Sequence, residues 1–236
     1  MSTGRPILFL GGAGLPAWIW DDVRRHLGQR HETQVAARPD DPTRLDDYVG
    51  AAIASAPDGE FVIVAHSSGG VIATEVARLL GERVVAILGI SAVFPSAGAS
   101  FMSSMPAPNR WMLGAVMRLA GTRPPESAIR RGVAHGLGDP VVERIVADFT
   151  PESPALYRDR VGDRSWIGWS GYVSTADDRE LPHTLQARFA HELGAGWSGD
   201  LPTGHLPMLE DPRAVAATIV RFIEARPGSA APPPTP

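Results

Sequence analysis

The chain has 236 residues and a mass of 25.1 kDa, which is enough for one α/β domain with a sizeable core. Its formal net charge of -4 gives no reason to expect a polyanionic partner, since nucleic-acid binding normally requires a concentrated basic face. There is no cysteine and all 22 basic residues are arginine, so disulfides, thiolate metal sites and lysine Schiff bases are excluded.

The amino-terminal region contains one short apolar run, Ile7–Leu10, which glycines follow. A helix that spans a membrane needs roughly 20 apolar residues, and a signal peptide has a charged region before its apolar segment. Because this stretch fits neither pattern, the sequence predicts a soluble, cytoplasmic protein without a membrane partner.

Apolar runs rich in β-branched residues alternate along the chain with segments of helical period. The predicted strands are Ile7–Leu10, Val35–Arg38, Phe61–Ala65, Val84–Ile90 and Tyr172–Thr175. The predicted helices are Asp21–Leu27, Leu45–Ala56, Val71–Leu80 and Ala214–Ala225. The alternation indicates an α/β fold with a mostly parallel central sheet and helices on both faces.

A segment from about residue 94 to 169 interrupts this alternation and is too long for a plain loop. It is rich in Met, Pro and Gly, with helical periods at Trp111–Leu119, Glu126–Val133 and Val141–Phe149. We therefore expect a helical cap insertion over one end of the sheet, within a single domain of residues 1–225. Residues 226–236, RPGSAAPPPTP, are expected to form a flexible Pro-rich tail.

The stretch FVIVAHSSGG, residues 61–70, joins a buried strand to an amphipathic helix through a turn with Ser67 at its tip. It fits the G-x-S-x-G nucleophile elbow with Ala65 in place of the first glycine. A serine in such a turn adopts a strained backbone, so its neighbours two positions away must be small, and Ala65 and Gly69 both are. The sequence predicts Ser67 as a nucleophile, although the same pattern also fits an ordinary strand-to-helix turn.

A serine nucleophile needs a base, and the base needs an acid that orients it. The best candidate base is His205, in the loop TGHLPMLEDP before the last predicted helix. The loop YVSTADDRELP follows the preceding strand and offers Asp177 and Asp178 as candidate acids. Serine, aspartate, histidine is the chain order found in α/β-hydrolases.

With these motifs the chain resembles the α/β-hydrolase fold superfamily, specifically its small single-domain esterase-like members, from about Ile7 to Ala225. AHSSGG, TADDRELP, GHLPMLEDP and LGGAGLPAWIW carry the resemblance. In related sequences the acid precedes a proline by four positions, as Asp178 precedes Pro182, so the resemblance favours Asp178 and leaves Asp177 as the alternative.

The resemblance also implies two oxyanion donors, the backbone N–H groups of Ala13 and Ser68. The first comes from the loop after the early strand and the second from the residue after the nucleophile. The chain departs from the family pattern at Gly11, where a histidine is usual, and this departure bears on the conformation of the loop that carries Ala13.

The insertion places methionine and aromatic side chains over the expected position of the serine, and such side chains form adaptable apolar surfaces. We predict that they contact an apolar part of the substrate; the alternative is that they seal the insertion to the domain. The predicted substrate-binding residues are Trp18, Met102, Met105, Trp111 and Met112.

The sequence thus predicts a serine hydrolase that cleaves a carboxylic ester or lactone with a bulky apolar portion. The partner would be a small molecule, with no nucleic acid, and the chemistry needs neither a metal nor an organic cofactor. Two alternatives remain: a lyase or cyclisation enzyme of specialised metabolism on the same scaffold, because one fold hosts many reactions, or a receptor-like binder with little turnover.

Overall fold

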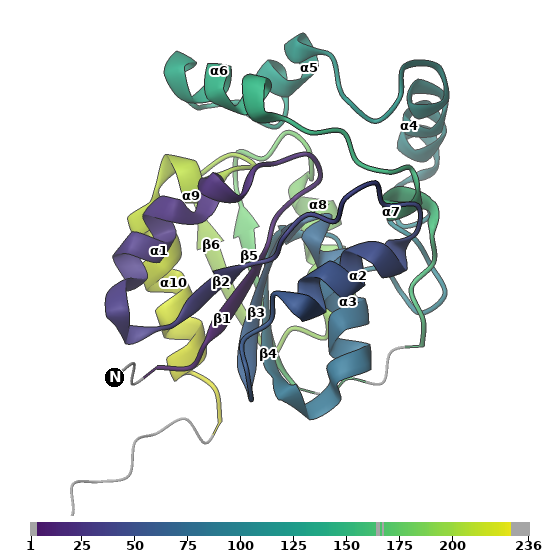
Figure 1. Cartoon of the computed structure of the whole chain (residues 1–236). Coiled ribbons are helices and arrows are strands. Elements are labelled where there is room, and N and C mark those ends of the chain that lie inside the picture. Colours follow the sequence, from purple (N-terminus) through teal and green to yellow (C-terminus); the bar gives the residue numbers. More distant parts are fainter. Residues whose placement is uncertain (1–3, 164–165, 167, 228–236) are drawn as a thin grey trace, which may run out of the picture.

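The computed structural model describes residues 4–163, 166 and 168–227 and has one parallel six-stranded sheet at its centre (Figure 1). The strand order is β2-β1-β3-β4-β5-β6, and each neighbouring pair is parallel. The strands are β1 (Ile7–Leu10), β2 (Thr33–Val35), β3 (Phe61–Ser67), β4 (Val84–Ala92), β5 (Trp169–Thr175) and β6 (Trp197–Leu201). The predicted α/β fold class, with its mostly parallel central sheet, is confirmed.

Helices cover both faces of the sheet, as Figure 1 shows. One face packs against α1 (Asp21–Leu27) and α10 (Pro212–Glu224), and the other against α2 (Leu45–Ala54), α3 (Gly69–Leu80) and α8 (His183–Leu193). The central strands are buried on both sides, which explains why β1, β3 and β4 read as continuous apolar runs. Shorter elements are η1 (Ala17–Trp20), η2 (Gly28–Arg30), η3 (Gly81–Arg83) and α9 (Pro207–Glu210).

In the sheet and the five helices that flank it, three elements differ from the expectations. Strand β2 lies at residues 33–35, earlier than predicted, and it pairs with β1 at the edge of the sheet. The edge strand β6 and the helix α8 were not predicted. The remaining differences in predicted strands and helices are shifts of a few residues at their ends.

Between β4 and β5 the chain forms α4 (Ala107–Ala120), α5 (Glu126–Arg131), α6 (Asp139–Asp148) and α7 (Ala155–Arg158). In Figure 1, α4, α5 and α6 lie at the top, beyond one end of the sheet, and α7 lies below α4, near α2. This is the end at which the carboxyl ends of the strands lie, because Thr150 and Glu152 form hydrogen bonds with Gly14, just after β1. Of the predicted tail, residues 228–236 lie outside the described part of the chain.

The order of the strands places the functional loops. From β1 the chain moves outward to β2, whereas from β3 it moves in the opposite direction to β4. In open parallel sheets, ligands bind beyond the carboxyl ends of strands at such a reversal. Here the loops after β1 and β3 meet at that point. Within the described residues, no helix has the length and apolar character required to cross a membrane.

Candidate active site

The turn between β3 and α3 carries Ser67 at its tip. Its φ is +52°, in the left-handed region that residues other than glycine seldom adopt. A Cβ on Gly69 would lie 2.5 Å from the carbonyl oxygen of Leu10, and one on Gly70 would collide with the backbone of Val93. Close packing of backbone against backbone therefore explains why small residues follow the serine.

We predict that Gly69→Ala destabilises the protein by about 1 to 3 kcal/mol, since the added methyl group forces the turn away from β1. Gly50→Ala is the matched control, because Gly50 is exposed in α2 and a Cβ there meets nothing within 4 Å. That change should stabilise the helix by about 0.5 to 1 kcal/mol. Urea denaturation measures the free energy of unfolding of both variants, and equal midpoints for the two would contradict the prediction.

Asp178 and His205 come together although 27 positions separate them. The Nδ1 atom of His205 lies 2.8 Å from Oδ2 of Asp178, and the two side chains are 4% and 0% exposed. Asp177 is exposed instead, and its backbone N–H donates to the carbonyl of Thr203. Of the two candidate acids, the structure therefore brings Asp178 to the histidine.

Among the described residues, every hydrogen-bond partner of the Asp178 carboxylate is a donor. Oδ2 accepts from the hydroxyls of Ser91 and Thr175 as well as from His205, and Oδ1 accepts the backbone N–H groups of Glu180 and Leu181. Burial alone would raise the pKa of Asp178, but the hydrogen bond and charge of His205, together with the bond from Ser91, hold this pKa well below its usual value of 3.8. The carboxylate is therefore ionised throughout the neutral range.

The imidazole of His205 is buried, and its pKa is raised above 6.5. Burial lowers this pKa, but the hydrogen bond to the Asp178 carboxylate and the charge of that group outweigh burial. With Nδ1 occupied by Asp178, the proton that His205 exchanges with another group must enter or leave at Nε2. This is the arrangement that a general base requires.

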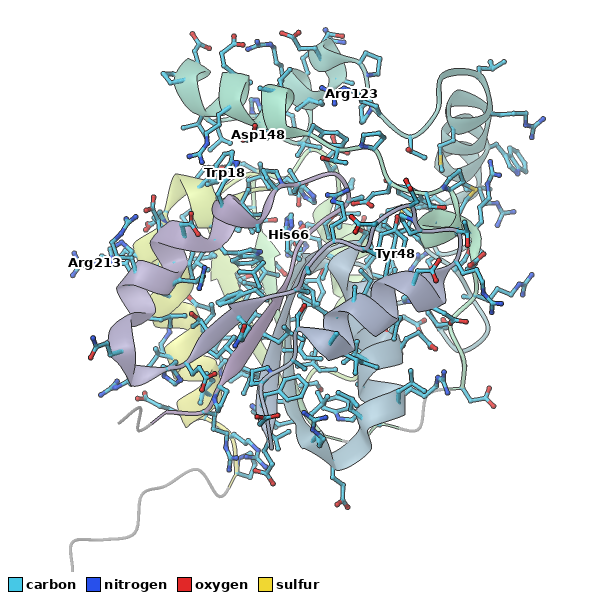
Figure 2. The ribbon with its side chains drawn as sticks, in the orientation of Figure 1. Trp18, Tyr48, His66, Arg123, Asp148 and Arg213 are labelled. Carbon is cyan, nitrogen blue, oxygen red and sulfur yellow. The ribbon has the colours of Figure 1, made fainter. Side chains whose placement is uncertain are left out.

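His66 links the serine turn to the histidine loop. Its Nε2 donates to the backbone carbonyl of His205 at 2.8 Å, and the two rings lie 4.7 Å apart between centroids (His66 is labelled in Figure 2). Burial and the nearby charge of His205 lower the pKa of His66 to about 3, so His66 is neutral near pH 7. Ser67 is the next residue, yet among the described residues its hydroxyl has no hydrogen-bond partner.

The loop after β1 lies directly against the serine. A Cβ on Gly12 would be 2.9 Å from the Cβ of Ser67 and 3.1 Å from Nδ1 of His66. Next in the chain, the N–H of Ala13 has no acceptor within the described residues, and the same is true of the N–H of Ser68, which precedes α3. The two loops that meet at Ser67 thus each carry one backbone N–H that has no acceptor in the described part of the chain.

The predicted substrate-binding residues lie in different settings. Trp18 donates its indole N–H to Asp148 at 2.8 Å; Figure 2 labels both residues, and Asp148 is the last residue of α6 in the insertion. Met105 is buried in the core around α3 and α8, and Met102 is half-buried. Trp111 is 68% exposed, so its indole does not line an enclosed pocket in this structure. The side chain of Met112 lies outside the described residues.

Ser91 and Thr175, which hold the Asp178 carboxylate, were not predicted as site residues. Ser91 lies at the carboxyl end of β4, and its φ of +42° again falls in the left-handed region. Thr175 ends β5. A signal was available, because polar residues at the carboxyl ends of adjacent parallel strands meet at one edge.

The chain belongs to the alpha/beta hydrolase family, whose sequence profile matches residues 7–218. This membership confirms the resemblance inferred from the motifs and the predicted class of α/β-hydrolase. No curated protein sequence matches the chain significantly.

Several solved structures share the fold. An extracellular alpha/beta-hydrolase from a Paenibacillus species superposes with a TM-score of 0.82 at 15% identity, covering 92% of this chain and 98% of its own. Polyneuridine aldehyde esterase gives 0.75 at 18% identity, covering 93% and 99%. The methylesterase MES16 from Arabidopsis gives 0.75 at 15% identity, also covering 93% and 99%.

Proposed function

We propose that the protein is a serine hydrolase that cleaves a carboxylic ester or lactone with a bulky apolar portion. The observation that carries this proposal is the Asp178–His205 hydrogen bond, formed beside the strained turn of Ser67. Esterases and other hydrolases among the structural neighbours support the same reaction class.

In the proposed mechanism, Nε2 of His205 takes the hydroxyl proton while Oγ of Ser67 bonds to the substrate carbonyl carbon. The carbonyl oxygen becomes an oxyanion, which the N–H groups of Ala13 and Ser68 stabilise. Asp178 fixes the tautomer of His205 and stabilises its protonated form. These are the roles that the chemistry requires of the five residues.

The oxyanion then collapses, the ester C–O bond breaks, and the leaving alcohol receives the proton from His205. Water next attacks the acyl-enzyme, gives a proton to the same imidazole, and a second collapse releases the acid and regenerates the Ser67 hydroxyl. The reaction balances with water as the only co-substrate. In this proposal the insertion acts as a cap over the serine, and its apolar side chains receive the apolar part of the substrate.

Fluorophosphonate labelling combined with an ester series tests this function. We expect one label per chain on Ser67, together with turnover of chromogenic esters that rises as the acyl chain becomes longer and more apolar. Labelling without turnover would favour the lyase or binding alternatives. Fastest turnover of short, charged acyl groups would contradict the apolar substrate.

The activity should depend on pH through His205. Because only neutral imidazole can accept the serine proton, activity is present above the pKa of His205 and is lost as the pH falls through it. This pKa is raised, so kcat/KM should have its acidic midpoint above 6.5. Asp178 and His66 keep their charge states across this range, so one midpoint is expected in a profile from about pH 5 to 9. A midpoint at or below 6.5 would contradict this assignment.

A further inference from the structure

The loop after β1 contains a tight turn from Gly12 to Leu15. The N–H of Leu15 donates to the carbonyl of Gly12 at 3.2 Å, and Gly14, the third residue, has φ +75°. A positive φ at the third position is typical of a type II turn. The C=O of Gly12 and the N–H of Ala13 belong to the same trans peptide and point in opposite directions. The hydrogen bond that fixes the carbonyl of Gly12 therefore also fixes the direction of the Ala13 N–H.

The central peptide of this turn joins Ala13 to Gly14, and its orientation distinguishes type I from type II turns. Its N–H donates to Oε1 of Glu152 at 2.9 Å, and the carbonyl of Gly14 accepts from the N–H of Thr150 at 3.0 Å. A Cβ on Gly14 would collide with the ring of Phe149. Residues 149–152 belong to the insertion, so the insertion holds the turn directly.

Glu152 is itself firmly held. Its side chain is only 6% exposed, and it forms an ion pair with Arg38 at 2.7 Å. Its second oxygen accepts the hydroxyl of Tyr48 on α2 at 2.9 Å, and Figure 2 labels that tyrosine. Arg38 also donates to the carbonyls of Leu15 and Thr150. The carboxylate therefore cannot move without breaking several bonds at once.

We propose that Glu152 is a positioning residue that fixes the Gly14 peptide in one orientation and thereby aims the Ala13 N–H at the oxyanion. The insertion then completes the catalytic site as well as covering it. This inference rests on the proposed function, because Ala13 acts as an oxyanion donor only if Ser67 attacks a carbonyl.

The first test variant is Glu152→Met, which keeps the side-chain volume but removes both acceptor oxygens. Misplacement of an oxyanion donor should lower kcat by about 10- to 100-fold and leave KM nearly unchanged, since the donor acts in the transition state. Glu152→Gln keeps one oxygen that can accept from Gly14, so it should recover much of the lost kcat. A purely structural role would not produce this split between kcat and KM.

Glu75 provides a matched control. It is also 6% exposed in its side chain, pairs with Arg78 at 2.8 Å, and accepts a backbone N–H, that of Gly162, at 2.8 Å. Among the described residues, its hydrogen bonds and its ion pair do not involve the turn after β1. Glu75→Met should therefore cost stability, as Glu152→Met does, without the selective loss of kcat.

Hydrogen–deuterium exchange supplies a readout that does not depend on activity. The amide of Gly14 should exchange faster in Glu152→Met than in the wild type, and at the wild-type rate in Glu75→Met. If the wild type shows neither labelling nor turnover, the proposed function fails, whereas the exchange rates still decide whether Glu152 holds the turn.

Unchanged kcat and unchanged Gly14 exchange in Glu152→Met would overturn the proposal, and so would an equal loss of kcat in Glu75→Met. Should Glu152→Met fail to fold, Glu152→Gln and Glu75→Gln carry the comparison. Faster Gly14 exchange and a smaller but selective loss of kcat in Glu152→Gln support the proposal, and identical behaviour of the two Gln variants overturns it.

Discussion

Ser67→Ala is expected to abolish fluorophosphonate labelling and to lower kcat for ester hydrolysis by about 10⁴- to 10⁶-fold. The loss should be this large because no other nucleophile can take over. The chain has no cysteine and no lysine, and the neighbouring Ser68 is 1% exposed. Stopped-time product assays with a chromogenic ester measure the residual rate. Ser198→Ala, which changes an exposed serine on β6, should keep the wild-type rate.

A second comparison at Ser67 concerns the stability of two variants. Because Ser67 has φ +52°, its backbone strain costs on the order of 1 to 3 kcal/mol. Ser67→Gly relieves that strain, whereas Ser67→Ala retains it. Both variants should be inactive, but the glycine variant should have the greater free energy of unfolding in urea. Rapid turnover by either variant would mean that the nucleophile lies elsewhere.

The parts of the fold that the sequence predicts well are those buried on both sides. Strands β1, β3 and β4 are continuous apolar runs, because helices cover both faces of the sheet there. Edge strands have a weaker pattern. In β6, WSGDL, only the last residue is buried, and β2, TQV, has no buried residue. These short polar strands depend on pairing with their neighbours.

Helix α8 was not predicted for a different reason. Its buried residues include Leu185, Phe189 and Leu193, which are four apart and lie along one face. Polar residues dilute this stripe, and Pro182 just before it is a typical start of a helix. The pattern was therefore present in the sequence, although it was weaker than in the other helices.

The residues of the candidate site also differ in how well the sequence predicts them. Ser67, Asp178 and His205 stand in loops with recognisable local sequences and a characteristic order, so they could be proposed together. Ser91 offers only the weaker signal of a polar residue at the end of a strand, and Glu152 has no local pattern. Their roles depend on contacts with Asp178 and Gly14, which lie 87 and 138 positions away along the chain. Only the folded chain reveals these partners.

Asp178→Asn should lower kcat by about 10⁴-fold, because the orientation of His205 depends on the carboxylate. The five partners of the Asp178 carboxylate in the described part of the chain all donate hydrogen bonds, so an amide NH₂ in place of either oxygen must face a donor. Turned toward His205, it would donate to Nδ1 and force the proton onto Nε2, where the serine proton should go. Turned away, it would oppose the backbone N–H groups of Glu180 and Leu181.

Asp177→Asn is the matched control, one residue away. Asp177 is exposed, and its contact with Thr203 uses the backbone, so this variant should keep the wild-type kcat and stability. Asp178→Asn should in addition lose about 1 to 3 kcal/mol of unfolding free energy, because a buried donor is left without an acceptor. Activity assays and urea denaturation of the two variants measure both effects. If Asp177→Asn lost the activity and Asp178→Asn kept it, the other aspartate would be the acid, and the buried network around Asp178 would serve stability alone.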